Sequence, residues 1–102
     1  MKKYHLLMNG QNFLVDMDGL TSKYGFYQNF YLEAESPKHA EVLVIQKIRG
    51  NDDLRTITKN IKEDPPVINL DEVLEIETFD GLDAMESGKA WYRERKWWQF
   101  WK

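Results

Sequence analysis

GFYQNFYLEAESPKHAEVLVIQKIRG, residues 25–50, decides the fold, because the spacing of its apolar residues changes within the stretch. Up to Ala34, apolar residues alternate with polar residues and tyrosines, which is the pattern of a half-buried strand. After Pro37 the apolar residues follow a stripe with a period near 3.6, which predicts an amphipathic helix. The helix is rich in β-branched residues, so burial against the sheet has to stabilise it.

The strand in this stretch is predicted to have one buried and one solvated face. Tyr27 and Tyr31 lie on the solvated face, near the carboxylates of Glu33 and Glu35. This alternation is typical of an antiparallel sheet with one side open to water. The predicted buried set is Phe26, Phe30, Leu32 and Ala34.

Capping residues fix the bounds of the helix at 37–49. Ser36 is a good N-cap, since its hydroxyl accepts from a free N–H of the first turn, and Pro37 suits the first helical position. Arg49 favours the negative end of the helix dipole, and Gly50 ends the helix.

The residues before this stretch predict a β-hairpin. Two short apolar-rich runs, 4–8 and 11–17, are separated by Asn9-Gly10, a dipeptide that suits a type I′ turn. Asp18-Gly19 marks a second turn. The stretch Asp16-Met17-Asp18-Gly19 does not fit a calcium loop, because the residues required at both ends of such a loop are missing.

The residues after Gly50 predict a short helix and then a loop. Asp52 or Asp53 serves as its N-cap, although residues 56–58 also suit a strand. Pro65-Pro66 ends this segment, because neither proline donates a backbone hydrogen bond.

Residues 67–79, VINLDEVLEIETF, predict another strand. Glu72 breaks its alternation, and a bulge near Asp71 and Glu72 reconciles the pattern. The predicted inward set is Leu70, Leu74 and Ile76. The carboxylates of this run are interpreted as a solvated face that discourages edge pairing.

Together these elements predict an α+β fold in two layers, a mainly antiparallel sheet of about four to five strands with the main helix, 37–49, on one face. Residues 33–48, EAESPKHAEVLVIQKI, resemble strand-to-helix joints of many two-layer α+β domains, including ferredoxin-like ones, and identify no family. We expect residues 1–95 to form a single domain and residues 96–102 a basic, Trp-rich tail.

Composition and motifs exclude several functions. The 102 residues include no cysteine, which excludes disulfides and thiolate chemistry. No phosphate-binding loop, zinc-protease or serine-hydrolase motif occurs, so we predict no enzyme, catalytic residue, metal or cofactor, and no small-molecule substrate is evident. His5 and His39 are interpreted as surface or partly buried residues.

The sequence predicts neither a signal peptide nor a membrane-spanning segment, which makes the cytoplasm the default location.

The C-terminal end is aromatic and basic. All four tryptophans fall in WYRERKWWQFWK, residues 91–102, and residues 89–102 carry a formal charge of +4 against −7 for residues 1–88. Residues 89–95 suit a final strand with Trp91, Arg93 and Arg95 on one face. The aromatic rings need a partner, which could be the domain itself, a second copy, a lipid interface or nucleic acid.

These features predict a non-enzymatic domain that works through protein contact, as a homodimer or with another protein. The predicted surface comprises Tyr27, Tyr31, Trp91, Tyr92, Arg93, Arg95, Lys96, Trp97, Trp98, Phe100 and Trp101. The alternative is a peripheral binder of single-stranded nucleic acid or anionic membrane through the C-terminal segment.

Overall fold

The computed structural model describes residues 1–17 and 19–94. This part of the chain forms four strands and two helices, which follow one another as β1 (Lys2–Met17), β2 (Leu20–Ala34), α1 (Pro37–Arg49), α2 (Asp52–Ile57), β3 (Val67–Ile76) and β4 (Ala90–Arg93).

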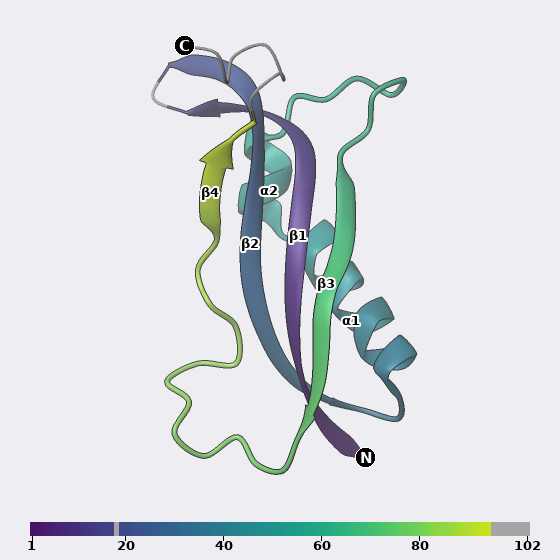
Figure 1. The fold of residues 1–102 in the computed structure, drawn as a ribbon. Helices are drawn as coiled ribbons and strands as arrows, with labels where there is room; N and C mark the ends of the chain where they lie inside the picture. The colour runs from purple at the N-terminus through teal and green to yellow at the C-terminus, as the bar shows by residue number, and fades with distance from the viewer. Residues whose placement is uncertain (18, 95–102) are drawn as a thin grey trace, which may run out of the picture.

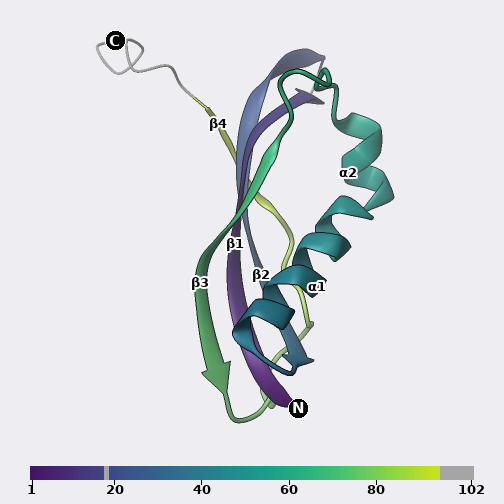
Figure 2. The same cartoon turned by 90° about the vertical axis from the view of Figure 1, so that its right-hand side faces the viewer.

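The strands form one antiparallel sheet in the order β3-β1-β2-β4 (Figure 1). Both helices lie on the same side of this sheet, and none of the described helices or strands covers its other face (Figure 2). The molecule is therefore a two-layer α+β fold, as the sequence predicts. The long β1–β2 hairpin forms its centre, with the shorter β3 and β4 at the edges.

The hydrophobic core lies between the sheet and α1. Strand β2 contributes Phe26, Phe30 and Ala34, which are almost fully buried as the alternation predicts. Helix α1 contributes Ala40, Val44 and Ile48 from one stripe.

Helix α1 has the predicted bounds and caps. The hydroxyl of Ser36 accepts from the backbone N–H of His39 at 3.1 Å, and Gly50 ends the helix. Helix α2 is also confirmed, but Asn51 rather than Asp52 or Asp53 caps it, with its side-chain oxygen 2.8 Å from the N–H of Leu54. Neither helix is long and apolar enough to span a bilayer.

The predicted turn at Asn9-Gly10 is wrong, because both residues lie inside the continuous strand β1. Gly10 is paired with Phe26, and a Cβ at residue 10 would overlap the Phe26 ring. The glycine is thus required for a close contact across strands and not for a turn. The chain reverses at the second predicted turn instead, where Gly19 has a φ of +79°.

Strand β1 contains a bulge just after Gly10. Gln11 and Asn12 lie opposite the single residue Gly25, and the register shifts there. Asn12 has a φ of +60°, a left-handed conformation that Asn adopts more readily than most residues. The bulge turns the side chain of Asn12 towards the loop that precedes β3.

The predicted bulge in β3 is confirmed, since Leu70 pairs with Met8 and Glu72 pairs with Leu7, which leaves Asp71 unpaired. Two of the three residues predicted to point inward, Leu74 and Ile76, do not face the core, however. The extra residue shifts the alternation, so that Ile68, Leu70 and Val73 pack against the core. Leu74 is 49% exposed on the other face, and Ile76 follows it in register.

The last strand is shorter than the predicted 89–95. Strand β4 pairs only with Tyr24–Tyr27 of β2. The chain before it continues along the same edge of β2 as a loop, where the N–H of Tyr31 donates to the Met85 carbonyl at 2.8 Å and that of Ser87 to the Asn29 carbonyl at 2.9 Å. This loop therefore covers the part of the β2 edge that β4 leaves open.

Candidate functional site: the tyrosine face

The sheet face opposite the helices carries aromatic and amide side chains along its length. We call it the tyrosine face, and register places on it His5, Leu7, Asn9, Tyr27, Asn29, Tyr31, Leu74 and Tyr92. Figure 1 views this face directly, with the helices behind the sheet. The face is partly apolar but rich in hydrogen-bonding groups, a mixture typical of protein-binding surfaces.

One half of the tyrosine face is organised around Tyr92. Its ring lies over Gly25, where any Cβ would overlap it. Its hydroxyl accepts from the side-chain amide of Asn9 at 3.1 Å, and Asn9 is only 4% exposed. Tyr27 lies beside it with the two ring centroids 5.6 Å apart. This tyrosine pair is therefore held in place by a buried amide and a glycine.

The other half is organised around His5 and Tyr31, which are directly paired across β1 and β2. Their rings are stacked with centroids 4.5 Å apart and planes 8° from parallel. The Nε2 of His5 lies 2.7 Å from the side-chain oxygen of Asn29. The backbone N–H of Asn29 in turn donates to the Ser87 hydroxyl at 2.9 Å, which ties this half to the loop before β4.

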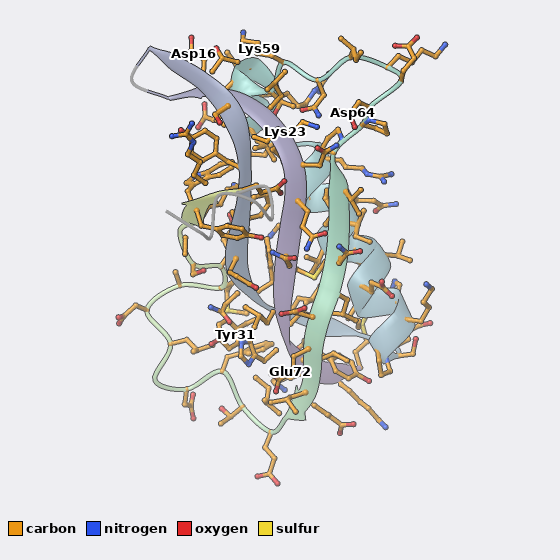
Figure 3. All side chains as sticks on the ribbon, turned by 45° about the horizontal axis from the view of Figure 1, so that its top comes forward. Asp16, Lys23, Tyr31, Lys59, Asp64 and Glu72 are labelled. Carbon is orange, nitrogen blue, oxygen red and sulfur yellow. The ribbon has the colours of Figure 1, made fainter. Side chains whose placement is uncertain are left out.

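The charges around the tyrosine face are unevenly distributed. On the β3 side Asp71, Glu72 and Glu75 are all exposed, and only Glu75 has a salt bridge within the described residues, 3.6 Å from Lys2. Figure 3 shows Glu72 and Tyr31 towards the same end of the sheet. On the β4 side the basic stretch 89–102 begins. One edge of the face is thus acidic and the other adjoins the basic end of the sequence.

A polar network closes the hairpin end of the sheet around Asp64. Its carboxylate accepts from the Lys23 ammonium at 2.9 Å and from the Asn12 side chain at 2.8 Å, and Figure 3 shows Lys23 and Asp64 at this end. The hydrogen bond from Lys23, followed by that from Asn12, lowers the pKa of Asp64 below its usual value.

We expect this carboxylate to make stability depend on pH. Because the pKa is lower in the folded state, its contribution is complete above the unfolded pKa of about 3.9 and is lost as the pH falls through the folded value. Asp64→Asn should therefore reduce the urea midpoint clearly at about pH 6 and much less at about pH 2.5. Asp83→Asn, at an exposed position without a salt bridge among the described residues, is the control. An equal loss for Asp64→Asn at both pH values would contradict the assignment.

The predicted surface residues do not all lie together. Tyr27, Tyr31 and Tyr92 share the tyrosine face, whereas Trp91 points to the helix side, where its ring centroid lies 5.1 Å from that of Phe26. Arg93 also points to the helix side and its Nε lies 3.3 Å from the Ser22 hydroxyl. The remaining predicted residues lie outside the described part of the chain: Arg95, Lys96, Trp97, Trp98, Phe100 and Trp101.

Several members of the tyrosine face were not predicted to lie on it, namely His5, Leu7, Asn9 and Leu74. The alternation of residues 3–9 contains the signal for the first three, because odd-numbered residues share one face once β1 is continuous. Because a turn was predicted at Asn9-Gly10, the shared face of these residues was not recognised from the sequence.

Comparisons with protein-family models, curated proteins and solved structures found no match. Among residues 1–17 and 19–94, no three His, Asp or Glu side chains are grouped so that they could hold a metal ion. The tyrosine face is therefore interpreted from its own chemistry.

Proposed function

We propose that this protein is a non-enzymatic interaction domain that self-associates by packing the tyrosine faces of two copies together. The observation that carries the proposal is the preordered set of aromatic pairs, Tyr27–Tyr92 and His5–Tyr31, on a sheet face that no described element covers. Aromatic side chains that are already fixed lose little entropy on binding, so such a surface is suited to association.

The charges are compatible with a second copy as the partner. A two-fold axis parallel to the strands brings β3 of one copy opposite β4 of the other. In this arrangement the exposed carboxylates of Asp71 and Glu72 of the two copies lie at opposite edges of the interface, so they do not repel each other. Edge-to-edge pairing of two β3 strands is disfavoured, since their carboxylates repel and the bulge at Asp71 interrupts the edge.

The size of the face sets the expected strength. The face extends over about nine residues along β1, or roughly 30 Å, and across four strands, or roughly 15 Å. Its area is therefore on the order of 450 Å² for each copy. Two copies would bury about 900 Å² in total, which is below the roughly 1,200 Å² at which stable interfaces begin and within the range of weak, transient contacts. We therefore expect reversible, concentration-dependent dimers.

The test is the mass in solution of the full chain and of two matched variants, measured by sedimentation over a wide concentration range. Leu74→Lys places a charge in the proposed interface and should shift the dimerisation constant by tenfold or more towards monomer. Val42→Lys is the control, because Val42 is exposed to a similar degree, 41% against 49%, on α1. A wild-type chain that stays monomeric throughout, or an equal effect of both substitutions, would reject the proposal.

Nucleic-acid or membrane binding by the C-terminal segment is less favoured. The charge of −7 on residues 1–88 opposes both polyanions, and Trp91 packs on the core, which leaves three tryptophans for such contacts. Salt-sensitive binding of single-stranded oligonucleotides or anionic vesicles by a monomeric chain would favour this alternative.

A further inference from the structure

A cleft lies on the helix side of the sheet, and a ligand could bind there whether or not the protein self-associates. Two hollows adjoin where the helices approach β2 and β4, and both are lined by Asn51 and Lys89. The first measures about 110 Å³ and is also lined by Gln28, Lys47 and Glu86. The second measures about 210 Å³ and is also lined by Leu54, Ile57 and Trp91, with Asp53 exposed at its rim. The cleft thus has a polar end and an apolar end.

Gln28 is the unusual residue of the polar end. It occupies a core-facing position of β2 between Phe26 and Phe30 and is only 4% exposed. Its Nε2 donates to the Ser87 carbonyl at 2.7 Å, which fixes the orientation of the amide, since a flipped amide would set two acceptors against each other. Its Oε1 is buried and has no hydrogen-bond partner among the described residues. A buried acceptor of this kind calls for a donor from outside the described residues.

The charges beside Gln28 include two ammonium groups and one carboxylate. Lys47 and Glu86 form a salt bridge of 3.4 Å at the partly exposed mouth. Lys89 stands 5.5 Å from the centroid of the Phe26 ring and has no salt bridge within residues 1–17 and 19–94. The polar end is therefore locally positive within an acidic domain. It suits a ligand that carries a small anionic group and, beside it, a donor for Oε1 of Gln28.

We infer that this cleft binds a free α-amino acid with an aromatic or branched aliphatic side chain. The ammonium group donates to Oε1 of Gln28 and faces Glu86, while the carboxylate binds the ammonium groups of Lys89 and Lys47. The side chain enters the apolar end against Leu54, Ile57 and Trp91. A hollow of about 210 Å³ is large enough, because benzene binds in a protein cavity of roughly 150 Å³.

The test uses L-phenylalanine as the probe and ¹⁵N-labelled full-length protein observed by NMR. We expect saturable shifts of the Gln28 side-chain amide and the Trp91 indole N–H signals. Phenethylamine, which lacks the carboxylate, and 3-phenylpropionate, which lacks the ammonium group, should each bind at least tenfold more weakly. Shifts that stay linear up to the solubility limit, or equal affinity for all three compounds, would overturn the inference and leave a bound water as the partner of Oε1.

Two variants separate binding from stability. Gln28→Met removes the orphan acceptor while keeping the length of the side chain, and it should weaken L-phenylalanine at least tenfold. Lys89→Gln, at a partly exposed position, should weaken it several-fold without changing the melting temperature, which keeps the test valid if Gln28→Met fails to fold. Gln46→Met on the exposed side of α1 is the matched control. Unchanged affinity in Lys89→Gln would contradict the proposed role of this lysine.

Discussion

Replacing Phe26 with alanine should lower the free energy of unfolding by about 3–5 kcal/mol, since it removes a fully buried ring and leaves a cavity. The ring contacts residues of both neighbouring strands, β1 and β4. Its centroid lies 5.3 Å from that of Phe13 and 5.1 Å from that of Trp91, and it also covers Gly10. Urea unfolding followed by circular dichroism measures this loss.

Tyr27→Ala is the matched comparison, because Tyr27 is the next residue of the same strand but points to the opposite, solvated face. We expect it to cost about 1 kcal/mol, mainly through the lost contact with Tyr92. Similar losses for Phe26→Ala and Tyr27→Ala would contradict the assignment of the two faces of β2.

Gly10→Ala should also destabilise the protein, by about 1–3 kcal/mol, through overpacking. A methyl group at this position would overlap three atoms of the Phe26 ring. Phe13 and Trp91 lie against the same ring, so it has little room to move away.

A double-mutant cycle identifies the cause. Phe26→Leu shortens the side chain that covers residue 10, so Gly10→Ala should cost less in the Phe26→Leu background than in the wild type. Gly88→Ala is the control glycine, because a Cβ there meets no atom within 4 Å. Additive losses in the cycle would show that the Phe26 ring is not what excludes a side chain at residue 10.

The local sequence pattern was sufficient to predict β2 and α1. The alternation around Phe26 and Phe30 and the caps Ser36 and Gly50 predicted β2 and α1, with the bounds of α1 correct. These signals lie in neighbouring residues, so no knowledge of tertiary contacts was needed to interpret them.

The predictions were wrong where contacts with a distant part of the chain determine the role of a residue. Asn9-Gly10 has the local chemistry of a turn, but the reason for Gly10 is the Phe26 ring on the next strand. The bulge in β3 was predicted, yet its position at Asp71 decides which of Val73 and Leu74 faces the core, and a shift of one residue exchanges them.

The candidate sites show the same division. Alternation predicted that Tyr27 and Tyr31 share a solvated face, whereas the partners that hold the aromatic pairs, Asn9 and Asn29, depend on the register between strands. The cleft around Gln28 could not be predicted, because it needs the packing of the helices beside Lys89.

The bulge at Asn12 joins three distant segments. Besides the contact of its side chain with Asp64, its carbonyl accepts from the Asn60 amide at 2.8 Å, and its backbone N–H donates to the Glu94 carboxylate. The connection from α2 to β3 is thereby held to β1 at both of its ends, since the Lys59 N–H also donates to the Leu14 carbonyl at 2.6 Å. The nine residues between α2 and β3 are thus held against β1, and a shift of α2 along the sheet would break these hydrogen bonds.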